Sequence, residues 1–343
     1  MRKKEILLSS IFILLITGFS SYFLYIENKV DKKELSVMQE QENKSVSSYI
    51  RNTEYYKEEY KNFYEQIEYQ EHMHFLEEIS TLLDLKYSPE EINNIYHFVS
   101  EENRGKLLKT EKMDIHNYYT IKNFEVEKIP RYEEYQRIHN CSLEEAVLKV
   151  NIGLDYDFYT QIEQIENTSD YTILVNKYHS LGEYEPNDLQ PLSYDAKYEM
   201  RKKARDAFEE LVSFAKLDNV YIRPYSAYRS YEYQNSLYNR YVNRDGKEKA
   251  DTYSARPGHS EHQTGLAVDV WSEGYTEILE SDAKWLKDNS YKYGFIVRYT
   301  KEKQSITGYI EEPWHLRYLG VDIATKVHEL GITYDEYYDL YIK

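Results

Sequence analysis

A single aspartate inside an otherwise apolar run most constrains how this chain can fold. The run Leu266–Val270 has the composition of a buried β-strand except at Asp269. Aliphatic and β-branched residues are favoured in strands, whereas aspartate is disfavoured there and an uncompensated buried carboxylate is costly. A fold that buries this strand therefore needs a cation or hydrogen-bond donors beside Asp269. The preceding segment supplies two histidines, His259 and His262.

A metal ion is one candidate for that cation. The chain of 343 residues has one cysteine, which excludes an internal disulfide and a cysteine-rich zinc site. His262 and Asp269 are suitable zinc ligands, and His315 is a candidate for the third. Glu312 precedes His315 by three residues and could accept a proton from a metal-activated water. On spacing alone, ordinary hydrogen-bonded polar residues explain these positions as well, so the spacing does not decide.

Charge excludes one class of function. The formal net charge is -17, with 60 acidic and 43 basic side chains. Nucleic-acid binding depends on basic surfaces that displace counterions from phosphates, and this chain offers no basic stripe. We therefore expect no nucleic-acid partner. The 39 tyrosines are attributed mainly to a composition bias shared with Lys, Glu, Asn and Ile.

The N-terminus contains a long uncharged segment. Ile6–Ile26 comprises 21 residues without a charge, enough to span a bilayer as a helix, and Arg2, Lys3 and Lys4 precede it. No convincing small-x-small cleavage site follows. We therefore expect an uncleaved signal anchor, in preference to a cleaved signal peptide or a buried helix. The protein is then a single-pass protein of the cell membrane, with its acidic remainder on the outer, cell-wall side.

Composition and capping signals divide the remainder. The stretch after the anchor lacks Gly and Pro and is interpreted as a helical stalk. Capping boxes at Ser88 and Ser142 indicate helices in the next region. The predicted domains are 1–30 (cytoplasmic tip and transmembrane signal anchor), 31–75 (helical stalk), 76–170 (mostly helical accessory module) and 171–343 (catalytic domain).

Helices and strands mix irregularly in the last domain, which predicts an α+β fold with an antiparallel sheet flanked by helices. Ser230 and Ser281 are the predicted N-caps of two of its helices. Strands are expected at 172–181, within 220–229, at 266–270 and at 293–299. Helices are expected at 194–216, from Ser230 to near 244–246, after Ser281 through Trp285, and at 321–331 and 333–341.

The histidine-rich motif resembles a known family signature. The frame Ser-x-His-x-x-Gly-x-Ala-x-Asp is matched at every position by Ser260, His262, Gly265, Ala267 and Asp269. This frame resembles that of the VanY/DacB-type zinc D-alanyl-D-alanine carboxypeptidases, peptidase family M15. The resemblance covers roughly residues 172–320 and includes "SAYRS" and "EPWHLRY". It implies a Hedgehog/DD-peptidase-like catalytic domain.

The resemblance also implies roles for individual residues. The implied zinc ligands are His262, Asp269 and His315. By the same resemblance, Glu312 is the general base and acid, and Arg229 binds and polarises the scissile carbonyl or the terminal carboxylate. Gln234 and Ser260 are implied as further substrate contacts.

The implied function is that of a membrane-anchored zinc metallopeptidase that removes the C-terminal D-alanine of peptidoglycan stem peptides by attack of a zinc-activated water. An L,D-carboxypeptidase or a peptidoglycan endopeptidase would use the same residues. A non-catalytic wall-binding scaffold would need neither Glu312 nor Arg229. The motif set of active-site serine carboxypeptidases is not evident in the chain, so a serine mechanism is rejected.

Overall fold

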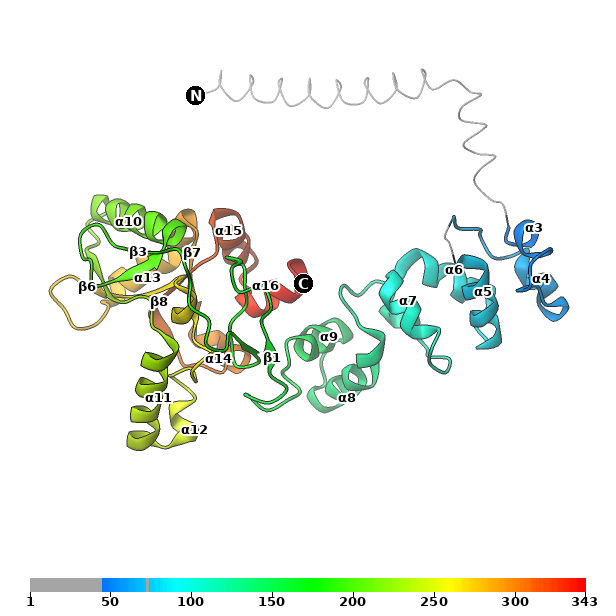
Figure 1. The fold of residues 1–343 in the computed structure, drawn as a ribbon, viewed down its shortest axis with the longest axis horizontal. Coiled ribbons are helices and arrows are strands. Elements are labelled where there is room, and N and C mark those ends of the chain that lie inside the picture. Colours follow the sequence, from blue (N-terminus) through cyan, green and yellow to red (C-terminus); the bar gives the residue numbers. More distant parts are fainter. Residues whose placement is uncertain (1–44, 72–73) are drawn as a thin grey trace, which may run out of the picture. The chain divides into compact units, whose positions relative to one another are not determined.

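The computed structural model describes residues 45–71 and 74–343. It divides the chain into two compact units, one ending at Thr120 and the other comprising Ile121–Lys343 (Figure 1). The predicted anchor at the N-terminus lies outside the described residues. Within the described residues, every helix is too short or too polar to cross a bilayer.

The first unit is helical. Its capping prediction is confirmed, because the Ser88 hydroxyl accepts a hydrogen bond from the Glu91 N–H while the Glu91 carboxylate accepts one from the Ser88 N–H. Where the sequence suggested a long stalk, residues 47–64 hold three short helices with Ile50 and Tyr64 buried. The elements are α3 (Ser47–Ile50), η1 (Glu58–Tyr60), α4 (Lys61–Tyr64), α5 (Phe75–Asp84), α6 (Pro89–Phe98), α7 (Glu101–Leu107) and η2 (His116–Tyr118).

The second unit is built on a four-stranded antiparallel sheet in the order β5-β6-β8-β7. Helices flank this sheet, so the predicted α+β architecture is confirmed (Figure 1). The strands are β1 (Glu163–Gln164), β2 (His179–Ser180), β3 (Leu189–Pro191), β4 (Glu199–Arg201), β5 (Ile222–Ser226), β6 (Ala267–Ser272), β7 (Phe295–Tyr299) and β8 (Glu312–Tyr318). The longer helices are α8 (Ile129–His139), α9 (Leu143–Asn151), α10 (Lys202–Leu217), α11 (Tyr231–Asp245), α13 (Glu280–Asn289), α15 (Val321–Leu330) and α16 (Tyr334–Tyr341). The short helices are η3 (Val126–Lys128), α12 (Lys247–Ala250), η4 (Glu261–Thr264), η5 (Ser290–Tyr293), η6 (Lys301–Lys303) and α14 (Gln304–Thr307).

The sheet has an apolar face and a functional face. Val268, Val270 and Leu316 pack in one core cluster with the buried side chains of α10. Fully burying each such aliphatic side chain contributes about 1.5–3 kcal/mol. Successive strand residues point to opposite faces, so Asp269 and His315 lie on the other side of the sheet. The aspartate therefore sits in a buried strand without entering the apolar core.

Helices α8 and α9 belong to the same unit as the sheet. The Lys149 ammonium of α9 lies 2.8 Å from the Glu336 carboxylate of α16. Asn151 at the end of α9 donates to the Asp339 carboxylate, also on α16, at 3.3 Å. The boundary between the two units therefore lies at residue 120, and α8 and α9 belong with the four-stranded sheet.

Several predicted boundaries change in the structure. Helix α10 begins at Lys202, not near residue 194, because residues 199–201 pair with 189–191 as strands β4 and β3. In the stretch 172–181, only His179 and Ser180 form a strand. Ser281 lies inside α13, whose N-cap is Leu279.

The helix α11 was predicted accurately. It begins after Ser230, whose hydroxyl accepts a hydrogen bond from the Tyr233 N–H, and ends at Asp245.

Candidate metal centre

Strand register brings Asp269 and His315 together. The two residues are cross-strand partners in the antiparallel pair β6–β8, and Ser226 of β5 is paired with Asp269 on its other side. The His315 Nδ1 atom lies 3.0 Å from the Asp269 Oδ1 atom. Residues 46 positions apart in the sequence thus become direct neighbours on the functional face.

A left-handed glycine brings His262 to the same point. Gly265 ends the short helix η4 with φ +68°, and the chain then enters β6. A Cβ atom at this position would lie 2.8 Å from Leu189 Cδ2, so only glycine fits without a rearrangement. The turn places His262 Nε2 3.2 Å from Asp269 Oδ2. One ligand atom from each of His262, Asp269 and His315 lies within 4.8 Å of the others, and all three residues are buried.

The hydrogen bonds define which nitrogen of each histidine carries its proton. A carbonyl oxygen and a carboxylate can only accept hydrogen bonds. His262 Nδ1 lies 2.7 Å from the Ala227 carbonyl oxygen, and His315 Nε2 lies 3.2 Å from Glu261 Oε2. These nitrogens are therefore the donors. The remaining nitrogens, His262 Nε2 and His315 Nδ1, face the Asp269 oxygens at 3.2 and 3.0 Å, where a lone pair on either nitrogen would meet negative charge.

Lone pairs facing a carboxylate require a cation between them. A proton on His315 is one solution: burial alone lowers the pKa of His315, but its contacts with Asp269 and Glu261 outweigh burial and raise the pKa to about 9. Burial and then the Arg229 guanidinium lower the pKa of His262 to about 4, so this ring stays neutral. A divalent metal ion is the other solution, and its binding would displace the His315 proton.

The donor set fits zinc. Two neutral imidazoles and one carboxylate are a common protein ligand set of catalytic zinc, which leaves a further coordination position open. Each histidine donates the one N–H of its neutral ring to a fixed acceptor, the arrangement that orients metal-binding imidazoles. Although burial alone raises the pKa of Asp269, the histidines and Arg229 hold it well below its usual range. The aspartate is thus a carboxylate ready to bind a cation.

Glu312 is placed for proton transfer. It begins β8, and its Oε2 atom lies 3.8 Å from His315 Nδ1, outside the three-ligand cluster. Burial raises the pKa of Glu312 to about 7, opposed by His315 and reinforced by the charge of Asp269. A carboxyl group with a pKa near neutrality can both accept and return a proton, as a general base and acid must.

Arg229 contacts the site through one of its ligands. Its Nη2 atom donates to Asp269 Oδ2 at 2.6 Å, and its Nε atom donates to Ser226 Oγ at 2.8 Å. Its Nη1 atom donates more weakly to Gln234 Oε1 at 3.4 Å. A guanidinium has five N–H donors, so these three bonds leave two for another acceptor.

The other predicted substrate contacts lie close by. Gln234 is 1% exposed, and its amide also donates to the Ala255 carbonyl at 2.7 Å, so it links Arg229 to the loop before the motif. Ser260 is buried and lines the cleft over the site. His259, the other histidine of the motif, has its Nδ1 atom 2.8 Å from the Asn176 carbonyl oxygen.

A cleft opens over these residues. Its volume is about 980 Å³, and it is lined by Glu312, His315 and Arg229 together with many aromatic side chains. The aromatic lining includes Tyr225, Tyr228, Tyr233, Tyr253, Trp271 and Trp314. A ligand in this cleft reaches the three candidate metal ligands, the base and the arginine at once.

The sequence interpretation missed Glu261. Its carboxylate is the acceptor for His315 Nε2, and Arg298 and Arg317 also donate to it. Burial alone raises the pKa of Glu261, but the two guanidinium groups outweigh burial and hold it well below its usual range. The available signal was Arg298 in the otherwise apolar strand β7, because a buried arginine requires an acidic partner.

Known proteins similar to this chain are carboxypeptidases and related peptidases. A family model described as "VanY: D-alanyl-D-alanine carboxypeptidase" matches residues 197–321. The Bacillus subtilis (strain 168) protein "Putative carboxypeptidase YodJ" is 41% identical over 193 residues, covering 52% of this chain and 70% of that protein.

Two solved structures are also similar. The LdcB LD-carboxypeptidase is 40% identical, with a TM-score of 0.49 and coverage of 53% of this chain and 91% of that one. A mutant of the vancomycin resistance D,D-pentapeptidase VanY, in complex with Zn(II), is 34% identical, with a TM-score of 0.46 and coverage of 49% and 99%.

Proposed function

The chain belongs to the VanY family of D-alanyl-D-alanine carboxypeptidases, and we propose that it is a zinc enzyme that removes the C-terminal D-alanine from peptidoglycan stem peptides. The observation that carries this proposal is the convergence of His262, Asp269 and His315 beneath a cleft that also contains Glu312. A purely structural metal site would be closed and would not need a carboxyl group of neutral pKa beside it.

Zinc held by His262, Asp269 and His315 would supply Lewis acidity, polarising the scissile carbonyl and lowering the pKa of a water molecule. Glu312 takes a proton from the attacking water. The oxygen of the water then forms a bond to the carbonyl carbon of the penultimate residue. The C–N bond to the terminal D-alanine breaks, and Glu312 returns the proton to the leaving amine. One Glu312 carboxyl group thus serves in both directions.

Arg229 binds and orients the substrate in this proposal. Its bonds to Asp269 and Ser226 fix the plane of the guanidinium, and its two remaining N–H donors match a carbonyl or a carboxylate oxygen. A fixed donor stabilises negative charge that develops on the substrate without reorganising during the reaction. Ser260 is the further proposed substrate contact. Gln234 acts on the substrate through Arg229, whose Nη1 atom donates to the Gln234 amide oxygen.

The test is cleavage of defined muropeptides by the purified full chain in detergent with zinc. Pentapeptides ending in D-Ala-D-Ala, tetrapeptides and cross-linked dimers are incubated separately, and the products are weighed by mass spectrometry, each with an EDTA control and a Glu312→Gln control. Loss of one alanine from the pentapeptide alone, abolished by EDTA, supports the proposal. Trimming of the tetrapeptide would make the protein an L,D-carboxypeptidase, and splitting of the dimer an endopeptidase. Cleavage of none, with zinc bound, would favour a wall-binding scaffold.

We also propose that Ile6–Ile26 anchors the chain in the cell membrane with the catalytic unit on the cell-wall side. The support is the uncharged 21-residue run after three basic residues. Peptidoglycan lies outside the membrane, so this placement brings the enzyme to its proposed substrate. Fractionation of cells, followed by protease treatment of intact protoplasts, tests both parts: a full-length chain in the soluble fraction, or one resistant to external protease, would contradict the placement.

A further inference from the structure

We propose that Glu261 is a positioning residue of the metal centre, which selects the His315 tautomer that can bind a metal ion. The inference rests on the proposed zinc site but concerns a residue without an assigned role. Glu261 has a fully buried carboxylate whose two oxygens have separate partners. Oε2 faces His315 Nε2 at 3.2 Å, and Oε1 accepts hydrogen bonds from both Arg298 and Arg317.

The first step of the argument is the direction of the His315 hydrogen bond. A carboxylate accepts and cannot donate, so His315 must carry its proton on Nε2 to bond with Glu261. The lone pair is then on Nδ1, the nitrogen 3.0 Å from Asp269 Oδ1. With the opposite tautomer, Nδ1–H would point at the metal position and His315 could not be a ligand. Glu261 therefore determines whether the third ligand is available.

The second step is that Glu261 cannot turn away. Arg298 Nε and Arg317 Nη1 lie 2.8 and 3.1 Å from its Oε1 atom. Arg298 is itself held by Asp335 of α16 through Nη1 at 2.8 Å. Arg317 donates through Nη2 to the Ile173 carbonyl at 2.8 Å.

These anchors come from parts of the chain distant in sequence. They hold the Glu261 Oε1 atom from two sides, so Oε2 remains directed at His315.

A glutamine at position 261 has almost the same shape but the opposite effect. The two arginines are donors only, so they select the amide oxygen of Gln for the Oε1 position. The amide NH₂ group must then face His315 and donate to its Nε2 atom. This bond favours the Nδ1–H tautomer, which is incompatible with metal binding through Nδ1.

The experiment measures zinc affinity of the full chain by competition with a chelator dye, without substrate. Glu261→Gln should weaken zinc binding by roughly 10- to 100-fold, the range typical for loss of a partner of a metal-binding histidine. The matched control is Glu336→Gln, which makes the same change in another buried carboxylate, one that pairs with Lys149 and Lys303 and does not contact His315. Glu336→Gln should lose stability and keep zinc affinity within about 3-fold of the original protein.

Equal loss of zinc affinity in both variants would overturn the proposal, since the general effect of neutralising a buried, paired carboxylate would then explain it. Unchanged affinity in Glu261→Gln would overturn it as well.

A second measurement needs no variant. Nitrogen-15 labelling of the ten histidines and long-range NMR correlations distinguish the two neutral tautomers. In the zinc-loaded original protein, His315 should show Nε2–H and a metal-shifted Nδ1, and a zinc-bound His315 with Nδ1–H would refute the role of Glu261. These readouts involve no substrate, so they remain valid whichever peptide bond the enzyme cleaves. Failure of zinc to bind the original protein would instead count against the proposed function.

Discussion

The free-energy cost of burying a charged side chain can be tested quantitatively at Lys177. The residue is 1% exposed, and its ammonium group donates to the Asp251 carbonyl. The ammonium nitrogen lies 3.9 Å from the centroid of the Tyr309 ring and 4.8 Å from that of Tyr159. Among the described residues it forms no salt bridge. Two effects therefore compete at this site: burial disfavours the cation, and the faces of the aromatic rings stabilise it.

We expect burial to be the larger effect. Burial lowers the pKa of Lys177 from 10.5 to about 8, against the opposing charge of Asp251. This difference corresponds to about 3 kcal/mol of destabilisation of the folded, charged form. The cost is fully present below pH 8. Between pH 8 and pH 10.5 the folded chain releases its proton before the unfolded chain does, so the free energy of unfolding rises with pH by up to about 3 kcal/mol.

The perturbation is Lys177→Met, which keeps an unbranched side chain and has no proton to release. Urea unfolding at pH 7 and pH 10.5 gives the free energy of unfolding of both proteins, and subtracting the variant cancels the titration of other groups. All three tryptophans, Trp271, Trp285 and Trp314, lie in the second unit, so their fluorescence reports its unfolding. Between pH 7 and pH 10.5, the free energy of unfolding of the original protein should rise by about 3 kcal/mol more than that of the variant.

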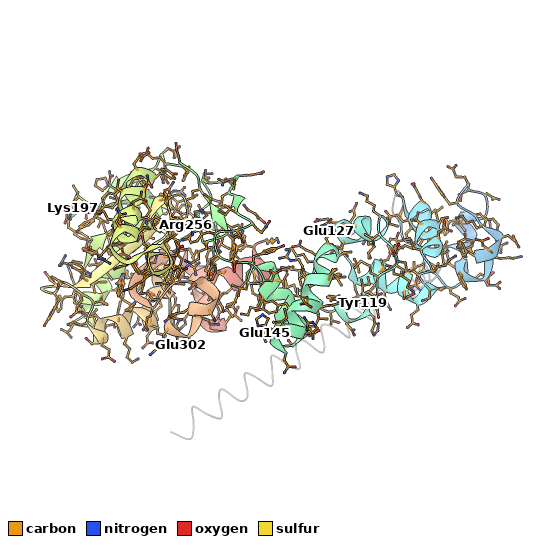
Figure 2. All side chains as sticks on the ribbon, turned by 90° about the horizontal axis from the view of Figure 1, so that it is seen from below. Tyr119, Glu127, Glu145, Lys197, Arg256 and Glu302 are labelled. Carbon is orange, nitrogen blue, oxygen red and sulfur yellow. The ribbon has the colours of Figure 1, made fainter. Side chains whose placement is uncertain are left out.

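The control variant is Lys284→Met, which removes an equal charge from a side chain that is 76% exposed. A rise in the free energy of unfolding that exceeds the Lys177→Met value by less than about 1 kcal/mol would refute the reasoning. Cation–π contacts, which contribute about 2 kcal/mol or more when desolvated, would then offset the cost of burial. Lys177 contacts both the segment of Asp251 and Tyr309, and the same two segments line the cleft through Tyr253 and Tyr309. Arg256, labelled in Figure 2, pairs with Asp251 at 2.7 Å beside this contact.

Three further predictions concern the site directly. Glu312→Gln should retain stoichiometric zinc by elemental analysis but lose at least about 100-fold in kcat, and near-normal turnover would show that Glu312 is not the base. His262→Ala and His315→Ala should each lose both zinc and D-alanine release, and full zinc content in either would contradict the ligand set. Gly265→Ala should lower the free energy of unfolding by about 2–5 kcal/mol in urea, since it combines a left-handed backbone with a contact to Leu189 at 2.8 Å; a loss under about 1 kcal/mol would show that the turn adapts.

Local signals in the sequence predicted much of the fold. The caps at Ser88 and Ser230 act on N–H groups only three residues away, so their helices could be read directly from the chain. Strands β6 and β7 were also found, because apolar runs of this length indicate buried strands, whereas β8, with Glu312 and His315 in it, was not identified. Predictions failed where pairing with another segment decided the local structure. Helix α10 was placed too early because β4 pairs with β3, and β-pairing partners cannot be read from one segment.

The candidate metal ligands were accessible to sequence reasoning for a related reason. His262 and Asp269 lie in one motif, and the requirement to compensate a carboxylate in an apolar strand pointed to a cation. The motif could not show that His315 is the cross-strand partner of Asp269, which depends on the register of β6 and β8. Nor could it show that Arg229 donates to Asp269, a contact between residues 40 positions apart.

Local patterns in the chain were enough to define the composition of the site: the absence of thiolate ligands, the set of histidines and carboxylates, and the buried strand that holds Asp269. The tautomer of His315 depends on the folded arrangement, because Glu261 is held by Arg298 of β7 and Arg317 of β8. The folded arrangement also decided that α9 packs on α16, through a Lys149–Glu336 contact between residues 187 positions apart. Local patterns encode which chemical groups are present, whereas hydrogen-bond direction and ion pairing depend on where distant segments meet.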